Sequence, residues 1–210
     1  MHPRKDTYWG RFAARYDRAT EYVVGRDIRE RLVDELRREG PLKEVLECGC
    51  GAGYFTRILA ERSSQVLATD LSGEMLETAM IRLGRCPNVQ LREADCRNLP
   101  FPDERFDTVV IANVLHTIPD PLRALQEAGR VVRRHGRVLV ISYTDFGMPP
   151  WEVFWMAMRY YRMFGPPPPD GLILFTPSRL RELLEEASLT VEEIRIVGSR
   201  TTALYGRAVK

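Results

Sequence analysis

Glu47-Cys48-Gly49-Cys50-Gly51-Ala52-Gly53 is a glycine-rich turn between a short apolar run, Val45-Leu46, and a segment of helical character at 55–60. Three glycines in one turn let the backbone approach a ligand without clashes from Cβ atoms. A helix that begins there directs free N–H groups and the positive end of its dipole toward the same ligand. The strand–turn–helix context therefore predicts a cofactor-binding turn.

The spacing of these glycines separates two classes of ligand. A dinucleotide fingerprint reads GxGxxG/A. Counted from Gly49, its third glycine would fall on Tyr54, so Gly53 comes one residue early. Glu47 would repel a pyrophosphate, whereas it suits a ligand with a cationic amino acid moiety. The turn favours such a ligand, and an NAD-dependent oxidoreductase remains the alternative.

Strands and helices alternate along the chain from this turn. Apolar runs predict strands at 45–46, 65–69, 89–92, 106–112, 137–142, 190–197 and 202–209. Helical patterns occupy 22–39, 55–60, the segment from the N-cap Ser72 to Leu83, 119–132 and 178–187. This order predicts an α/β fold with a doubly wound, mostly parallel, seven-stranded sheet. The last two strands, joined through Gly198, form a C-terminal antiparallel hairpin.

We expect one domain over residues 1–210, with N-terminal helices at 7–39 and a lid-like insertion at 145–175. Pro166–Pro169 is a stiff spacer in that insertion. A helix at 151–164 would carry a broad apolar arc of Trp151, Phe154, Trp155, Met158 and Tyr161. The arc could be plain core, a lid over an apolar ligand, or a surface that touches lipid. We favour the lid, which makes Trp151, Trp155, Met158 and Tyr161 substrate-binding residues.

Composition sets limits on partners and location. The net charge is +2, so no strongly basic face predicts nucleic-acid binding. No apolar run approaches the ~20 residues needed to cross a bilayer, and no secretory leader is evident. The four cysteines, Cys48, Cys50, Cys86 and Cys96, have neither disulfide-framework nor metal-site spacing. We therefore expect a cytoplasmic protein with no metal ion, no nucleic acid and no stable membrane insertion.

With these motifs together, the sequence resembles the class I S-adenosylmethionine-dependent methyltransferases. The matching stretches are ECGCGAG at 47–53, the acids Asp70 and Asp95, FDTVVIANVLH at 106–116 and RVVRRHGRVLVIS at 130–142. FAARYD at 12–17 is similar to the N-terminal helix of the branch that includes ubiquinone and menaquinone C-methyltransferases. The resemblance covers nearly the whole chain in the correct order. It implies a Rossmann-like methyltransferase fold and S-adenosylmethionine as cofactor, with S-adenosylhomocysteine as product.

The resemblance also implies roles for individual residues. Gly49, Gly51 and Gly53 would line the methionine part of the cofactor, with Glu47 at its rim, and Asp70 would accept both ribose hydroxyls. The remaining cofactor-binding residues are Leu71 and Met75 near the adenine, Asp95 and Cys96 at its amino group, Asn113 and Leu115 beside the methionyl moiety, and Tyr16 as a cover from the N-terminal helix. For two of these residues an alternative without a binding role stays open: Asp95 could be a solvated loop residue, and Tyr16 could serve only to pack the N-terminal helix.

Methyl transfer from a sulfonium is an in-line displacement that needs alignment, a dry site and, for an acidic acceptor, a general base. His116, Tyr143 and Asp145 follow the fourth and fifth strands at the edge where doubly wound folds bind ligands. We take His116 as the first candidate base, against the alternative of a hydrogen-bonding or packing histidine.

The predicted function is S-adenosylmethionine-dependent methyl transfer to a small, apolar or aromatic acceptor. The alternatives are the oxidoreductase above and a non-catalytic cofactor-binding protein that kept the fold. No Asn/Asp-Pro-Pro-Tyr motif follows the fourth strand, which argues against amino-directed DNA or glutamine methylation. RNA or protein methylation and arsenite methylation are disfavoured. The oligomeric state, monomer or homodimer, stays open.

Overall fold

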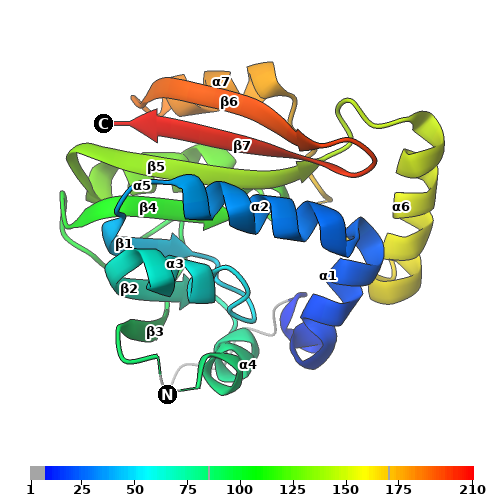
Figure 1. The fold of residues 1–210 in the computed structure, drawn as a ribbon, viewed down its shortest axis with the longest axis horizontal. Coiled ribbons are helices and arrows are strands. Elements are labelled where there is room, and N and C mark those ends of the chain that lie inside the picture. Colours follow the sequence, from blue (N-terminus) through cyan, green and yellow to red (C-terminus); the bar gives the residue numbers. More distant parts are fainter. Residues whose placement is uncertain (1–7, 85, 170) are drawn as a thin grey trace.

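The computed structural model describes residues 8–84, 86–169 and 171–210. Within them, one seven-stranded sheet runs through the molecule in the order β3-β2-β1-β4-β5-β7-β6 (Figure 1). The strands are β1 (Lys43–Cys48), β2 (Ser63–Asp70), β3 (Val89–Glu93), β4 (Phe106–Ala112), β5 (Val132–Thr144), β6 (Thr190–Gly198) and β7 (Thr202–Val209).

Helices connect these strands and precede them. They are the 3-10 helix η1 (Gly10–Arg15), α1 (Tyr16–Val24), α2 (Arg26–Arg38), α3 (Thr56–Arg62), α4 (Gly73–Leu83), the 3-10 helix η2 (Leu115–Thr117), α5 (Pro121–Val131), α6 (Pro150–Phe164) and α7 (Pro177–Glu186). The predicted N-cap is confirmed, because the Ser72 hydroxyl accepts a hydrogen bond from the Met75 N–H at 3.2 Å. Asp120 and Thr176 cap α5 and α7 in the same way.

Strands β1 to β5 pair in parallel, and β7 runs antiparallel to both β5 and β6. The α/β fold predicted from the sequence, with its C-terminal antiparallel hairpin, is therefore confirmed. The carboxyl ends of β1, β2, β4 and β5 meet at one edge because these strands run parallel to one another.

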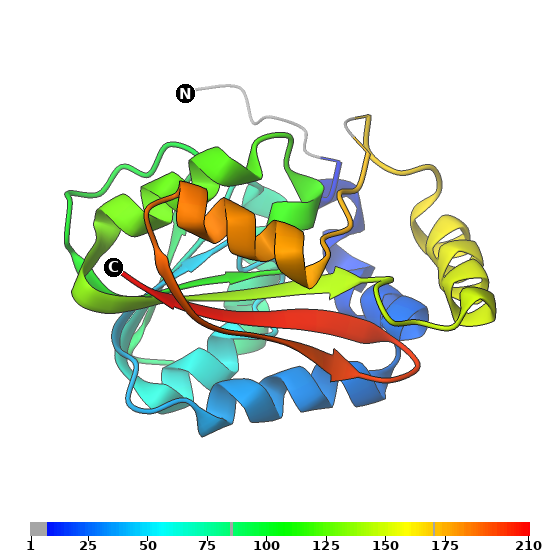
Figure 2. The ribbon, with the colours of Figure 1, turned by 90° about the horizontal axis from the view of Figure 1, so that it is seen from above.

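Successive side chains of the central strands point to opposite faces, and each face is covered. Val45 of β1 and Val110 of β4 belong to a core cluster with α2 and α3. Their neighbours Leu46 and Val109 belong to a second cluster with α5 and α7. Figure 2 shows α2 and α3 (blue and cyan) on one side of the sheet and α5 and α7 (green and orange) on the other. These fully buried side chains each stabilise the fold by about 1.5–3 kcal/mol.

The N-terminal helices differ from the prediction of one helix at 22–39. The pattern is split at Gly25, whose φ of 90° ends α1 and allows α2 to begin in a new direction. Helix α1 therefore starts at Tyr16, and residues 10–15 form a 3-10 turn instead of part of the same helix. Thr7, the expected start of the helical region, lies outside the described residues. The break lets α1 cross the carboxyl edge of the sheet while α2 covers its face (Figure 1).

Helix α6 lies beyond that edge and packs against α1 (Figure 2). Its inner face includes Met156, Tyr160 and Phe164, which pack on the cluster that contains Phe12. Of the residues that the structure describes, no helix is long and apolar enough to span a bilayer.

Candidate active site

A cavity of about 390 Å³ opens at the carboxyl ends of the parallel strands. Glu47 in β1, Asp70 in β2, Ala112 in β4 and Tyr143 in β5 all reach its wall. Its other side is formed by the N-terminal helices and by Pro168 and Pro169. The cavity therefore sits where doubly wound folds bind their ligands.

The glycine turn forms the floor of this cavity. Gly49 has a φ of 72°, and a Cβ built there would overlap Cγ2 of Val114. A side chain is thus excluded by backbone conformation and by space together. The turn is held in place by two hydrogen bonds of 2.8 Å, one from Cys50 N–H to the Thr69 carbonyl and one from Gly51 N–H to the side-chain Oδ2 of Asp70.

Glu47 is a buried carboxyl group at the end of β1, with 1% of the residue exposed. The Thr56 hydroxyl donates a hydrogen bond to its Oε2 at 2.6 Å. Burial raises the pKa of Glu47 to about 7, and the nearby Asp70 carboxylate raises it further in the same direction. A buried acid without a cationic partner is costly, and a bound cation would remove that cost.

Asp70 ends β2 and faces the same cavity. Its carboxylate accepts hydrogen bonds from Gly51 N–H at 2.8 Å and from Ser72 N–H at 2.9 Å. Burial raises the pKa of Asp70, and the backbone donors oppose that rise. Asp70 therefore ties the glycine turn to the start of α4 while presenting a carboxylate to the cavity. Leu71 and Met75 also reach the wall beside it.

Asp95 and Cys96 lie at the cavity wall as predicted, but Asp95 has a protein partner. Its Oδ1 accepts from the Arg97 backbone N–H at 2.9 Å and from Arg97 Nε at 3.0 Å, and Arg97 Nη2 lies 2.8 Å from Oδ2. A ligand amino group would have to share this carboxylate with Arg97. Burial raises the pKa of the Cys96 thiol to about 12, so the thiol is protonated at neutral pH.

Asn113 and Tyr143 bring the ends of β4 and β5 together. The Asn113 side-chain oxygen accepts a hydrogen bond from Tyr143 N–H at 3.2 Å, and Asn113 N–H donates to the Ile141 carbonyl at 2.7 Å. Both side chains line the cavity. Burial raises the pKa of the Tyr143 phenol well above its usual range, so the hydroxyl is neutral at physiological pH.

Aromatic side chains from the N-terminal segment complete the wall. Tyr16 lines the cavity, and burial is the main reason that its pKa rises to about 12. Trp9 packs edge-on against Tyr16 with ring centroids 5.9 Å apart, and Tyr8 packs edge-on against Trp9 at 4.8 Å. The polar turn and this aromatic wall together give the cavity one charged region and one apolar region.

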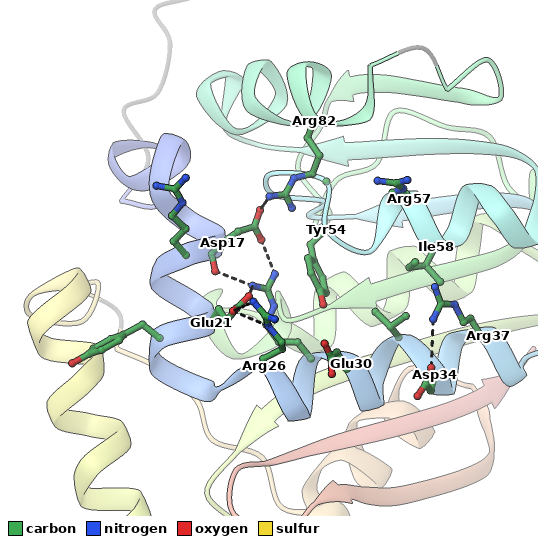
Figure 3. A pocket seen from close by; sticks show the side chains of 15 residues that line it. Asp17, Glu21, Arg26, Glu30, Asp34, Arg37, Tyr54, Arg57, Ile58 and Arg82 are labelled. Atoms are coloured by element: carbon green, nitrogen blue, oxygen red, sulfur yellow. Dashed lines mark hydrogen bonds and ion pairs between the residues drawn. The ribbon is translucent and has the colours of Figure 1, made fainter.

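A charged groove of about 1080 Å³ lies behind this wall, between α1, α2, α3 and the end of α4 (Figure 3). Its side chains largely pair with each other. Asp17 forms ion pairs with Arg29, at 2.6 Å, and with Arg82, and the Arg29 guanidinium stacks 3.6 Å from the centroid of the Tyr54 ring. Asp17, Arg29 and Tyr54 also border the smaller cavity. The pairs in this groove therefore fix α1, and with it Tyr16, against the glycine turn.

Four of the predicted cofactor-binding and catalytic residues do not reach the cavity wall. Gly53 faces α4, where a Cβ would contact Ala79, so it serves close packing of the turn against that helix. Leu115 is fully buried in the core cluster under α5 and α7. Asp145 lies in the loop after β5 and does not line the cavity.

The fourth is His116, the first candidate base. Its Nδ1 lies 3.3 Å from the Ser142 hydroxyl, and its carbonyl accepts from Ile173 N–H at 2.9 Å. Burial lowers the pKa of His116 to about 4, which makes it a neutral and weak base at pH 7. Its position favours the alternative weighed from the sequence, a hydrogen-bonding histidine that holds the insertion against the end of the sheet.

The predicted substrate-binding residues on α6 also lie away from the cavity. Trp151, Trp155, Met158 and Tyr161 are between 49% and 64% exposed, and none of them borders it. The physical reason is that α6 packs on α1 through its opposite face. The insertion reaches the cavity through Pro168 and Pro169 instead, and Asp170 lies outside the described residues.

The comparisons with known proteins agree with this geometry. Residues 46–140 match the family model described as a methyltransferase domain. This segment contains the glycine turn, Asp70, Asp95 and Asn113. Residues 46–140 therefore form a methyltransferase domain of the class I S-adenosylmethionine-dependent type. S-adenosylmethionine is the cofactor of this family.

Two relatives illustrate the family at the level of sequence. A phosphatidylethanolamine N-methyltransferase from Cereibacter sphaeroides is 38% identical over 47% of this chain and 50% of its own length. A ubiquinone/menaquinone biosynthesis C-methyltransferase from Ectopseudomonas mendocina is 34% identical over 65% of this chain and 57% of its own length. The chain thus spans only about half of these relatives.

Solved structures of methyltransferases share the fold. A methyltransferase from Thermotoga maritima has a TM-score of 0.73 with 20% identity, covering 97% of this chain and 98% of its own. Another from Aquifex aeolicus has a TM-score of 0.68 with 21% identity, covering 95% and 98%.

Several cavity residues were missed by sequence reasoning, namely Tyr8, Trp9, Thr20, Arg29, Tyr54, Phe55, Ile118, Pro168 and Pro169. The aromatic cluster at the start of the chain was the available signal for Tyr8 and Trp9. Among the residues that the structure describes, no three His, Cys, Asp or Glu side chains form a group that could hold a metal ion.

Proposed function

We propose that this chain transfers the methyl group of S-adenosylmethionine to a small, apolar or aromatic acceptor. One observation carries the proposal: a single cavity joins a glycine turn, the buried Glu47 carboxyl group and the half-buried Asp70 carboxyl group to a wall of aromatic side chains. The names of the two relatives, which refer to a phospholipid and to quinones, support an apolar acceptor.

The residues present fit the cofactor. Gly51 borders the cavity with a φ of 52°, and a Cβ there would lie 3.7 Å from Cε1 of the Tyr16 ring, so its missing side chain lets a ligand approach the backbone closely. The buried Glu47 carboxyl, with its raised pKa, is suited to a cationic amino group. Asp70 would hold the ribose diol in charge-assisted hydrogen bonds. Leu71, Met75 and Cys96 would enclose the adenine.

When bound, the cofactor supplies a methyl group already activated on a sulfonium. The protein then has to align the acceptor and exclude water. Tyr143, Tyr16 and Trp9 line the apolar part of the cavity, and their ring faces can stabilise a cationic methyl. Asn113 fixes the backbone of Tyr143 through its 3.2 Å hydrogen bond.

An acidic acceptor must also lose a proton, either to a general base or before it binds. Of the three candidate bases, we propose that Tyr143 alone contacts the acceptor, because His116 and Asp145 do not border the cavity. The raised pKa of the Tyr143 phenol makes it a hydrogen-bond donor and a poor base. We therefore propose that alignment and desolvation drive transfer, and that the acceptor atom is ionised or carries a lone pair when it binds.

The experiment is methyl transfer from labelled S-adenosylmethionine to a panel of phenols, quinones, thiols and amines, with phosphatidylethanolamine included. We expect label in an apolar or aromatic member and none in reactions with Asp70→Asn protein. An Asp34→Asn variant is the matched control, because Asp34 lies on α2 at the surface. Binding of the cofactor without transfer to any member would favour the non-catalytic alternative.

A further inference from the structure

The outer surface of α6 is a continuous apolar strip made by Trp151, Phe154, Trp155, Met158 and Tyr161, here called the α6 outer face. These side chains are 49–64% exposed. Their positions recur every three or four residues, so they lie on one side of the helix. With about 150–250 Å² for each large side chain, the exposed area is on the order of 500 Å². A patch of this size on one surface marks an interaction site.

Helix α6 is apolar on two sides, because its inner face, with Met156, Tyr160 and Phe164, already packs on the core cluster that contains Phe12. Its inner side carries Glu152, which is 8% exposed and pairs with Arg200 at 2.8 Å and with Arg159 at 4.0 Å. An amphipathic helix that only covered the protein would turn its apolar arc inward. The arrangement therefore leaves the α6 outer face for a partner outside the part of the chain that the structure describes.

The chemistry of the α6 outer face matches a lipid surface. Two of its five side chains are Trp and one is Tyr, the residues that prefer the boundary between hydrocarbon and water because they are amphipathic. The net charge around the α6 outer face also favours a lipid surface. It is +2, from Arg159, Arg162 and Arg200 against Glu152. Arg162, exposed on the same side of α6, forms no ion pair with the described residues. A positive sum favours a negatively charged bilayer.

The position of α6 in the molecule also fits. The helix stands at the outer edge of the fold, where no other described helix or strand covers its outer side in either view (Figures 1 and 2). Its C-terminal end is joined to the cavity, since the Tyr8 hydroxyl donates to the carbonyls of Phe164 at 3.1 Å and Pro166 at 2.7 Å. Tyr8, Pro168 and Pro169 line that cavity. A surface bound by α6 would therefore lie beside the active site.

We propose that the α6 outer face binds the surface of a negatively charged lipid bilayer, with the helix lying in the headgroup region. The proposal goes beyond methyl transfer and holds for any acceptor. It requires no helix to cross the membrane.

The test is co-sedimentation of the full chain with vesicles of phosphatidylcholine alone, or mixed with about one-third phosphatidylglycerol. We expect binding to the mixed vesicles that weakens as salt is added. A Trp151→Ser/Trp155→Ser variant should bind about tenfold or more weakly, because two interfacial anchors are lost. The matched control is Met80→Ser/Ile81→Ser on α4, where the residues are 60% and 81% exposed, and its binding should equal that of the parent.

Thermal unfolding and S-adenosylmethionine binding of each variant show that it is folded, and they separate this proposal from the proposed function. Three results would overturn the proposal. The first is a parent protein that does not sediment with the mixed vesicles, and the second is a Trp151→Ser/Trp155→Ser variant that sediments equally well. The third is a dimer by light scattering that this variant converts to monomer, since a second copy would then cover the α6 outer face.

Discussion

Replacing Glu47 by Gln should stabilise the ligand-free protein and weaken cofactor binding at the same time. The carboxyl group is buried at the end of β1, and burial raises its pKa from 4.5 to about 7. Gln keeps an oxygen that can accept the hydrogen bond from the Thr56 hydroxyl, and its amide nitrogen faces the cavity. The substitution thus removes the charge with little change in shape.

The size and sign of this change in the free energy of unfolding follow from the linkage between proton binding and folding. Between pH 4.5 and about 7 the unfolded chain has lost the Glu47 proton while the folded protein still holds it, so stability falls as pH rises through this window. A shift of this size amounts to about 3 kcal/mol. Above pH 7 the Gln variant should therefore be more stable than the parent by up to about 3 kcal/mol, and by at least about 1 kcal/mol after imperfect solvation of the amide.

The assay is urea unfolding of the ligand-free parent and variant at pH 4.5, 6 and 7.5. Glu127→Gln is the matched control with the opposite sign. The Arg130 guanidinium lowers the pKa of Glu127, so this variant should lose stability at neutral pH, with the loss shrinking as pH falls. A Glu47→Gln protein that is less stable than the parent at pH 7.5, or whose difference from the parent does not change with pH, would refute the reasoning.

Three further predictions address the cavity. Asp70→Asn should weaken S-adenosylmethionine binding about 10- to 100-fold by calorimetry, because a charge-assisted hydrogen bond is lost; unchanged affinity would contradict its role. Gly49→Ala should lower stability by about 3 kcal/mol in urea unfolding, from backbone strain and from overlap with Val114. Adding Val114→Ala should recover part of that loss, and no recovery would show that the overlap is irrelevant. Tyr143→Phe should lower kcat/KM about tenfold. His116→Asn should change kcat/KM less than about threefold, whereas loss of a general base would lower it at least about 100-fold. A larger fall in kcat/KM for His116→Asn would restore His116 as the base.

The fold could be predicted because each strand has an apolar pattern that can be recognised in its own stretch of sequence. Phe106–Ala112 is an apolar run buried on both faces, and the structure begins and ends β4 at those same residues. The glycine turn and the N-cap Ser72 fix where helices begin. The split between α1 and α2 was missed because apolar residues on both sides of Gly25 keep a helical period, and a single glycine does not always end a helix.

The site was harder to predict for a physical reason. Residues at the carboxyl ends of β1 and β2, such as Glu47 and Asp70, are placed by the sheet itself, so their location follows from the strand pattern. Residues of the N-terminal helices and the insertion are placed by tertiary packing. The apolar arc of α6 is a correct helical pattern, yet the pattern does not say which side packs inward, and the structure turns it outward. His116 follows β4 as expected, but its side chain turns toward Ser142.

The central claim is that the cavity binds an amino-acid-bearing nucleoside through Glu47, Asp70 and the glycine turn. Calorimetric titration of the protein with S-adenosylmethionine and, separately, with NAD at pH 7.5 tests it directly. We predict one S-adenosylmethionine bound per chain, with no measurable heat from NAD. Binding of NAD in place of S-adenosylmethionine would contradict the account.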